Sequence, residues 1–300
     1  MGGAVVDHAL TVLLALLAAV FLAIGIVVRQ RATIDVPAEH GVSPVMIQTL
    51  LRRPLWWAGT ASALAGFVCQ ALALANGSLL LVQPILTSAL LFALPLSARL
   101  SHRRVTRSEW CWAMLLTSAL AVFVVLARAV PGDYDTSLAT SMVVAVVCAA
   151  VVSACVLVAT RIIGPRRAAL LAVAVGVLFG VVALLTKLVM HMLTHDGPRA
   201  VLTSPVLYLL VLLGVLAMLL QQSAFHAGSL QTSVPTMLVL EPVIAVLLGA
   251  VVLGEHLAVG GWGSAAIAVS ALAMAVATVA LGREEGAYEE QLGAMANQRR

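Results

Sequence analysis

Long stretches of apolar side chains, separated by short polar connections, run through most of this 300-residue chain. Each is about 20 residues long, which lets a helix cross about 30 Å of hydrocarbon. None alternates as a strand would, and backbone groups in lipid must be satisfied within their own segment. The pattern therefore predicts an all-α integral membrane protein with nine transmembrane helices, at residues 9–28, 55–76, 78–98, 110–127, 139–160, 168–190, 205–226, 231–253 and 262–281.

Composition and charge agree with this fold class. Apolar residues make up 62% of the chain and charged residues 10%, which excludes a water-soluble domain. Fourteen of the seventeen basic residues fall in four connections or ends: Arg29, Arg31, Arg52 and Arg53; Arg99, Arg103, Arg104 and Arg107; Arg161, Arg166 and Arg167; Arg283, Arg299 and Arg300. The positive-inside rule then predicts an outside N-terminus and an inside C-terminus in the cytoplasmic (inner) membrane. The basic clusters serve as topology signals, and no nucleic-acid partner is expected.

Several other classes of protein lack support in the sequence. No basic residue precedes the first apolar stretch, so we interpret that stretch as a first span and not as a signal peptide. No phosphate-binding glycine loop, nucleophile with a base, or zinc pattern is present. We therefore expect no enzymatic activity, catalytic residue, metal site or cofactor, and we expect free thiols at the four cysteines, Cys69, Cys111, Cys148 and Cys155.

Two segments repeat each other at an offset of 151 residues. Gln70, Ala73, Gly77, Ser78, Leu79 and Pro84 recur as Gln221, Ala224, Gly228, Ser229, Leu230 and Pro235. Five predicted crossings separate the copies, and an odd number makes them inverted. Inverted repeats are typical of secondary transporters, because exchanging the conformations of the two halves turns an outward-open state into an inward-open one.

The two predicted repeats are unequal. Residues 1–138 hold four spans, residues 139–282 hold five, and residues 283–300 form a cytoplasmic tail. The missing span corresponds to the connection 29–54. Within it, the segment Pro44–Arg53 has the pattern of an amphipathic helix lying on the membrane surface, with an ordinary loop as the alternative.

The segment from Ser229 to Glu255 resembles the final helical hairpin of the drug/metabolite transporter superfamily, of the EamA type. The matching features are Ser233, a mid-helix Pro242, and the closing Gly254 and Glu255. The first half looks more like the nine-span, NIPA-related branch, through Pro54, Trp56, Trp57, Gly59, Ser78, Val82, Gln83 and Pro84. The resemblance to the superfamily implies a transport function. The resemblance to the NIPA-related branch implies that magnesium is the transported ion. In one departure, Arg104 stands where the offset places the partner of Glu255.

Glu241 is the strongest candidate for a functional residue. It falls at the midpoint of a predicted span, where a carboxylate is costly, and such residues usually serve a function. Pro242 frees carbonyl groups in the preceding turn, which suits a cavity wall. We hypothesise a proton-linked or cation-linked role for Glu241. The alternative is a protonated Glu241 that is hydrogen-bonded to a neighbouring helix and has no transport role.

Further polar residues lie inside the apolar stretches. Gln70, Gln83 and Gln221 either contact a substrate or join helices through polar contacts. For Lys187 we favour a side chain that snorkels to the outer interface. A cation-binding mouth formed with its neighbours His191, His195 and Asp196 is the alternative. Gly176 and Gly180 form a GxxxG face, for which packing within the monomer is preferred and a homodimer is the alternative.

Taken together, the sequence predicts a secondary transporter that moves a metabolite or drug-like solute by alternating access. The predicted substrate site is formed by Glu241, Gln70, Gln83, Gln221 and Pro242. Two alternatives remain: a NIPA-like magnesium or divalent-cation carrier, and a non-transporting membrane scaffold or accessory subunit. We rank magnesium below an organic solute as the substrate. A hydrated dication is usually bound by several carboxylates, and the predicted spans contain one. The expected partners are a small-molecule or ion substrate and the lipid bilayer.

Overall fold

The computed structural model describes residues 2–34, 53–100, 105–127, 129–130, 132, 138–227, 230–258 and 260–298. Nearly all of these residues are helical. The helices are α1 (Gly2–Ile34), α3 (Pro54–Asn76), α4 (Leu79–Leu86), α5 (Ala89–Leu100), α6 (Arg107–Leu126), α7 (Leu138–Ala159), α8 (Pro165–His195), α9 (Pro198–Thr203), α10 (Pro205–Ala227), α11 (Leu230–Val252) and α12 (Trp262–Gln298). Two short strands, β1 (Ala129–Val130) and β2 (His256–Leu257), complete the described fold.

By length and composition, eight helices of the described part can cross a membrane, with α4 and α5 counted as one segment, Leu79–Leu100. Large apolar side chains are exposed along them, such as Val146 of α7 and Leu272 of α12, as lipid-facing positions require. The predicted all-α, multi-pass membrane fold is confirmed. The predicted span 205–226 coincides with α10. The apolar stretch of α10, Pro205–Gln221, is shorter than those of the eight candidate spans and is not counted among them.

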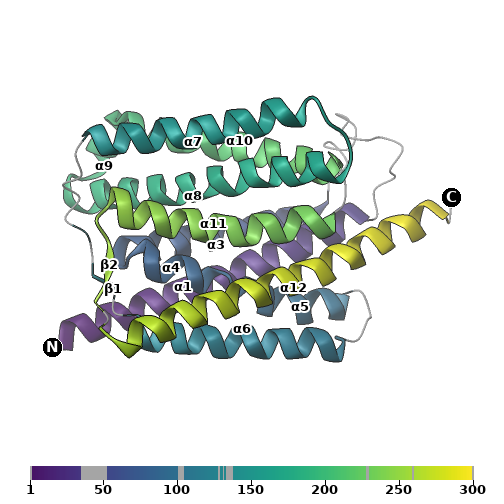
Figure 1. Cartoon of the computed structure of the whole chain (residues 1–300), viewed down its shortest axis with the longest axis horizontal. Coiled ribbons are helices and arrows are strands. Elements are labelled where there is room, and N and C mark those ends of the chain that lie inside the picture. The colour runs from purple at the N-terminus through teal and green to yellow at the C-terminus, as the bar shows by residue number, and fades with distance from the viewer. Residues whose placement is uncertain are drawn as a thin grey trace.

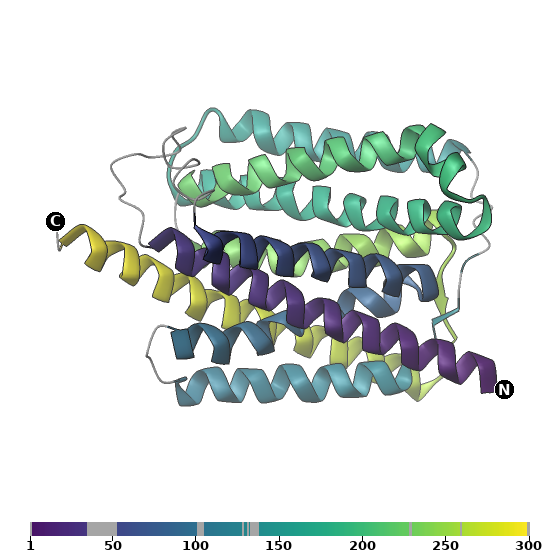
Figure 2. The ribbon, with the colours of Figure 1, turned by 180° about the vertical axis from the view of Figure 1, so that it is seen from behind.

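The long helices lie side by side along the long axis of the molecule, and their connections gather at its two ends (Figure 1). Helices α7, α8 and α10 occupy one side, and α5, α6 and α12 occupy the other. On one face α1 packs along α3 (Figure 2), while α11 packs between α8 and α12. The short helix α4 contacts α1, α6, α8 and α11, so it lies at the centre of the bundle.

The two ends of the bundle differ in charge. At one end, β1 pairs antiparallel with β2 through Ala129–Leu257 and Val130–His256. This end, here called the ribbon end after the two paired strands, also holds the start of α1 and α9. The opposite end, here called the arginine end, holds the C-terminal end of α12. The helix ends there carry most described arginines, namely Arg53, Arg99, Arg107, Arg161, Arg166, Arg167 and Arg283.

Helix boundaries follow the sequence repeat. Helices α3 and α10 begin at Pro54 and Pro205, and α4 and α11 begin at Leu79 and Leu230, so both pairs keep the 151-residue offset. Along the chain in Figure 1, α3 and α10 run in opposite directions, as do the helices that follow them. Matching segments of the chain therefore fold into matching but oppositely directed helices.

One predicted span is broken where its counterpart is continuous. The expected helix 78–98 divides into α4 and α5 at Thr87 and Ser88. The Thr87 N–H donates to the Pro84 carbonyl at 3.3 Å and the Ser88 N–H to the Ile85 carbonyl at 3.0 Å, so the backbone forms a tight turn there. The Thr87 hydroxyl also donates to the Pro84 carbonyl at 2.6 Å. Helix α11 also contains a proline at the matching place, Pro235, but continues to Val252. A proline at this place therefore does not by itself break the helix.

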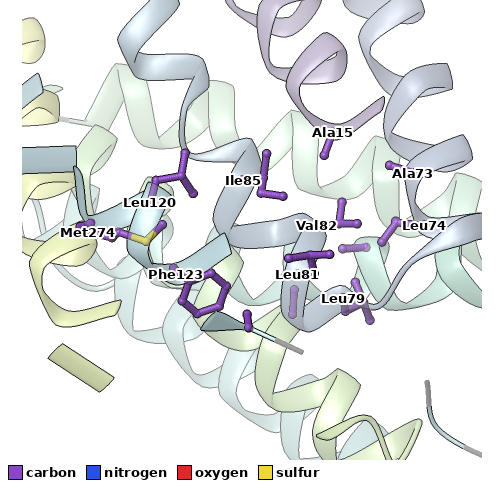
Figure 3. Close-up of a cluster of buried hydrophobic side chains, with 14 of the residues drawn as sticks. Ala15, Ala73, Leu74, Leu79, Leu81, Val82, Ile85, Leu120, Phe123 and Met274 are labelled. Carbon is purple, nitrogen blue, oxygen red and sulfur yellow. The ribbon is translucent and has the colours of Figure 1, made fainter. Parts of the chain in front are cut away.

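The main hydrophobic core surrounds α4 (Figure 3). Leu79, Val82 and Ile85 of α4 are fully buried, with Phe123 of α6 and Met274 of α12 in the same cluster. Elsewhere, close helix contacts depend on glycine. A Cβ at Gly180 of α8 would come within 2.5 Å of Ile244 of α11, and one at Gly176 within 2.8 Å of Leu240. The GxxxG face therefore packs within the chain, as preferred from the sequence.

Two sequence predictions concern the ends of segments. The amphipathic segment Pro44–Arg53 falls, except for Arg53, outside the described residues, as do Gly228 and Ser229 of the repeat. The helix of the last span extends into the residues predicted as the tail, 283–300. Helix α12 continues from Trp262 to Gln298, and within it Glu284 accepts a hydrogen bond from the Ser108 hydroxyl of α6 at 2.6 Å.

Candidate functional site

The predicted site residues come from four different helices. Glu241 and Pro242 lie at the middle of α11 and are half-buried. Gln70 of α3 is buried, Gln221 of α10 is half-buried, and Gln83 of α4 is 1% exposed. Among the described residues, no hydrogen bond joins these side chains to one another. Within the described residues, the Glu241 side chain also makes no hydrogen bond to a neighbouring helix, which the alternative interpretation expects.

Glu241 and Gln83 lie at different depths. Gly249 of α11 faces Leu79, the first residue of α4. Helix α4 runs from this level toward the arginine end, and α11 runs from the arginine end toward this level. With a rise of about 1.5 Å per residue, Gln83 lies about 6 Å from that level and Glu241 about 12 Å. Along the bundle axis, Gln83 and Glu241 are therefore about 6 Å apart.

Of the five buried polar side-chain atoms that lack a hydrogen-bond partner in the described structure, four lie in or beside the segment that contains α4. Within the described structure they include the Ser78 and Ser88 hydroxyls, the Gln83 amide nitrogen and one oxygen of Glu255. Buried polar groups in proteins are nearly always paired, and leaving one unpaired costs about 1–3 kcal/mol. Three of these four atoms belong to the segment from Ser78 to Ser88, so α4 presents unused hydrogen-bonding capacity at the core of the bundle.

Lys187 of α8 is buried, not exposed at the interface. Its side chain is 5% exposed, and its ammonium donates to the carbonyl oxygens of Leu74 at 2.6 Å and Gly77 at 2.5 Å. These carbonyls lie at the C-terminal end of α3, where the last turn has no partners of its own and carries partial negative charge. The predicted snorkelling of Lys187 was wrong. The connection between α3 and α4 at Gly77 and Ser78, here called the α3–α4 break, supplies the ammonium with acceptors inside the bundle.

Glu255 approaches the same break from the other side. After α11, Gly254 adopts a left-handed φ of 69°, and the Glu255 N–H donates to the Gly249 carbonyl at 3.1 Å, which turns the chain back. The Glu255 carboxylate is 3% exposed and accepts the Leu80 N–H at 3.3 Å. A Cβ at Gly249 would lie 2.9 Å from this carboxylate, so the glycine leaves room for it.

Burial and charge act against each other at Glu255. Burial raises the pKa of Glu255, while the Lys187 ammonium and the N–H groups of Leu80 and Leu79 lower it, and burial is the larger influence. The two ends of the α3–α4 break therefore receive opposite charges: a cation at the carbonyl end of α3 and a carboxylate at the N–H end of α4. Both placements match the helix dipoles.

The break itself is closely packed. Gly77 connects α3 to α4 in an extended conformation, so its need for glycine is not conformational. A Cβ at this position would overlap the Thr11 side chain of α1. Helices α1, α3, α4 and α8 and the segment after α11 thus meet around residues 77 and 78.

Two further predictions concern metal ligands and thiols. His191 and His195 stack with ring centroids 4.1 Å apart, and the His195 ring contacts the His191 carbonyl. Within the part of the chain that the structure describes, no group of three His, Cys, Asp or Glu side chains is arranged to hold a metal ion. The four cysteines are free.

Sequence reasoning gave Lys187 the wrong surroundings and used Glu255 only as a family motif. One signal favoured Lys187, since it is the single lysine of the chain and lies in an apolar helix, where ionisable residues are usually functional. No local signal places Glu255 beside Leu80, because 175 residues separate them. A second buried carboxylate, Glu109, was missed although Thr106 and Glu109 form a recognisable capping box.

Comparison with known proteins identifies a relative but not an activity. No family model matches the chain, and no solved structure matches it. An uncharacterized protein of Corynebacterium glutamicum is 38% identical over 277 residues, which cover 92% of this chain and 96% of the relative. Identity at this level along almost the full length of both chains shows common descent. The chain belongs to the family of this Corynebacterium glutamicum protein.

Proposed function

We propose that this protein is a secondary transporter that moves a small organic solute across the cytoplasmic membrane by alternating access. The observation that carries the proposal is the pair of matching helix pairs, α3–α4 and α10–α11, which begin at the same 151-residue offset and run in opposite directions. Oppositely directed copies of one unit are the architecture with which many carriers open to alternate sides. The proposal includes membership of the drug/metabolite transporter superfamily, which the hairpin from Ser229 to Glu255 resembles.

The proposed topology has nine crossings, with α10 as the seventh and the N-terminus outside. It places the arginine end in the cytoplasm, in agreement with the positive-inside rule, and the ribbon end outside. In this topology residues 1–138 and 139–282 form the inverted repeats. The unpaired groups of Ser78 and Gln83 then lie between the outer face and the mid-depth Glu241, along the axis where a solute would pass.

Chemistry favours a polar organic solute. Gln83, Ser78 and Ser88 offer neutral hydrogen-bonding groups in an apolar setting, which is the usual composition of a small-molecule site. No observation favours the magnesium alternative, since the described residues hold no group of three metal-ligating side chains. A scaffold or accessory subunit has no use for unpaired buried polar groups, which lower stability. In the proposal Glu241 takes up and releases the coupling proton.

The test is transport by purified protein in liposomes that contain a pH-sensitive dye. Amino acids, nucleosides, quaternary ammonium compounds and magnesium are added in turn, and solute-driven proton movement is recorded. We expect an organic solute to drive proton movement in the wild type, Glu241→Gln to abolish it, and Glu241→Asp to retain it in part. Glu109→Gln, at the arginine end, is the matched carboxylate control and retains it.

Two results would contradict the proposal. If Glu241→Gln moves solute at the wild-type rate with the same pH dependence, Glu241 has no coupling role. If magnesium alone produces a response and every organic solute is silent, the substrate class is wrong. A protein that responds to nothing, although correctly inserted and folded, supports the scaffold alternative.

A further inference from the structure

We propose that Lys187, Glu255, the C-terminal end of α3 and the N-terminal end of α4 form a proton-exchanging site. This site holds the ribbon end of the bundle closed while Glu255 is ionised. Uptake of a proton by Glu255 releases this closure. The inference rests on the proposed function only in assigning the ribbon end to the outer face and in giving the closure a role in transport. The site itself lies apart from Glu241, near the C-terminal end of α11.

Both charged side chains tie together segments that are far apart in the chain. Lys187 belongs to α8 and binds the end of α3, 110 and 113 residues away. Glu255 follows α11 and binds the start of α4, 175 residues away. The two side chains belong to the second proposed repeat and bind a break within the first. The contacts therefore form and part when the repeats approach and separate at this end.

Charge supplies the switch. A buried ammonium is tolerated when an anion lies near it, and removing that anion leaves a costly uncompensated charge. Lys187 is 5% exposed, and the carboxylate whose charge acts on it is Glu255. Once Glu255 is neutral, the ammonium keeps the carbonyl acceptors of Leu74 and Gly77 but no compensating charge, and hydration then stabilises it. Water reaches it when the ribbon end opens.

The protonation step is simple and balanced. One proton from water joins a Glu255 oxygen and converts the carboxylate to a carboxylic acid, and the reverse step returns the proton to water. One Glu255 oxygen already accepts the Leu80 N–H, while the other is buried without a hydrogen-bond partner in the described structure. The second oxygen is therefore the position for the proton. Burial of Glu255, which raises its pKa, favours this uptake.

Few other titratable groups surround the site. Helices α3 and α4 carry no charged residue, and the only one on α11 is Glu241 at mid-depth. His191 follows Lys187 by one turn of α8, and the exposed His256 of β2 follows Glu255 directly. At this end of α1, His8 is half-buried. Substituting His8, His191 and His256 by Asn tests whether a histidine, and not Glu255, sets the pH response.

The experiment measures access to the break. Ser78, which is 3% exposed, is replaced by cysteine in a chain whose native cysteines are serines. Labelling by a membrane-impermeant maleimide is followed from each side of sealed membranes without any solute, as a function of pH. After correction for the maleimide's own pH dependence, we expect labelling from the ribbon side to be slow at high pH. It should rise by about tenfold per pH unit as the pH falls toward the Glu255 pKa, following the protonated fraction.

Three variants make the test specific. Glu255→Gln should label quickly at every pH, because the ammonium is never compensated. The double variant Lys187→Met with Glu255→Gln should return to slow labelling, because no buried charge remains. A purely structural role predicts the opposite, namely a double variant that is at least as open as Glu255→Gln. Glu109→Gln, a buried carboxylate at the other end, should match the wild type.

A second measurement needs no variant of the site. Lys187 is the chain's single lysine, so selective isotopic labelling of lysine gives one side-chain NMR signal. That signal should shift with the same pH midpoint as the labelling of residue 78. A signal that is unchanged across this range overturns the proposal, as does pH-independent labelling of the wild type or an open double variant.

The outcomes also separate this inference from the proposed function. Labelling and NMR require no substrate, so the site can behave as expected in a protein that moves no solute, in which case the transport proposal fails alone. A protein that transports solute but labels independently of pH retains its function and loses this site. A histidine triple variant that abolishes the pH response assigns the proton to a histidine and overturns the role of Glu255.

Discussion

Two buried carboxylates accept backbone N–H groups at helix N-termini, one at each end of the bundle, and both are 3% exposed. Glu109 accepts the Thr106 N–H at 2.6 Å, while the Thr106 hydroxyl accepts the Glu109 N–H at 3.1 Å. Glu255 accepts the Leu80 N–H from across the bundle. The first carboxylate completes its own helix, and the second joins two distant segments.

The difference shows why burial alone does not indicate function. The Glu109 bond spans three residues and persists wherever α6 goes, so it cannot sense the arrangement of the other helices. The Glu255 bond exists only when the end of α11 lies against α4. Glu255 also shares its surroundings with Lys187, whose charge depends on it for compensation. A carboxylate becomes a candidate switch when it is both buried and held by a remote partner.

The largest expected effect comes from removing the ammonium. Lys187→Met leaves the Glu255 carboxylate and the carbonyls of Leu74 and Gly77 buried without their cation, and we expect it to lower the free energy of unfolding by about 3–5 kcal/mol. Adding Glu255→Gln should recover a large part of this loss. Denaturant titration in mixed micelles measures both. A single variant as stable as the wild type would mean that the ammonium is not engaged.

Close packing at the break should give the next largest effect. Gly77→Ala forces a Cβ against Thr11 and should destabilise by about 2 kcal/mol, a typical cost of overpacking. The matched control is Gly214→Ala in α10, where an added Cβ meets nothing within 4 Å. That change should be neutral, or stabilise by up to about 1 kcal/mol through helix propensity. Equal effects at both glycines would refute the packing explanation.

A pH effect should follow from Glu255. Because its pKa is raised in the folded protein, the folded state holds more protons than the unfolded state between the ordinary and the raised value. The free energy of unfolding should therefore fall as pH rises through that window, by at most about 1.4 kcal/mol per pH unit. Glu255→Gln should remove this contribution from the slope measured in buffered micelles. An unchanged slope would assign the pH dependence to other groups.

Sequence patterns were sufficient for most of the long helices, because hydrophobic runs are local features of the sequence. The predicted spans 55–76, 139–160 and 205–226 agree within one residue with α3, α7 and α10. The broken span was missed, since a turn at Thr87 is a weak local signal inside an apolar run. The strands β1 and β2 were missed as well, because two-residue strands pair across 126 residues and leave no pattern in either segment.

The candidate site was harder to predict for a physical reason. Glu241 and Gln83 could be picked out because a polar residue inside an apolar run is visible in the sequence. The partners of Lys187 and Glu255 are backbone groups of Leu74, Gly77 and Leu80, which no residue type reveals. Only the meeting of α3, α4, α8 and the end of α11 creates them. Glu109 lies at the other extreme, since its partner Thr106 is three residues away and the capping pattern is explicit.

The smallest expected effect sharpens the comparison from the local side. Thr106→Ala removes the hydroxyl that accepts the Glu109 N–H and should cost about 1 kcal/mol, the usual value of an N-terminal cap, while Thr106→Ser should cost almost nothing. Neither variant should change labelling of a cysteine at position 78, because the capping box bonds only within its own helix end. If Thr106→Ala opened the ribbon end, the two ends would be coupled through α6, and the distinction between a local and a bridging carboxylate would fail.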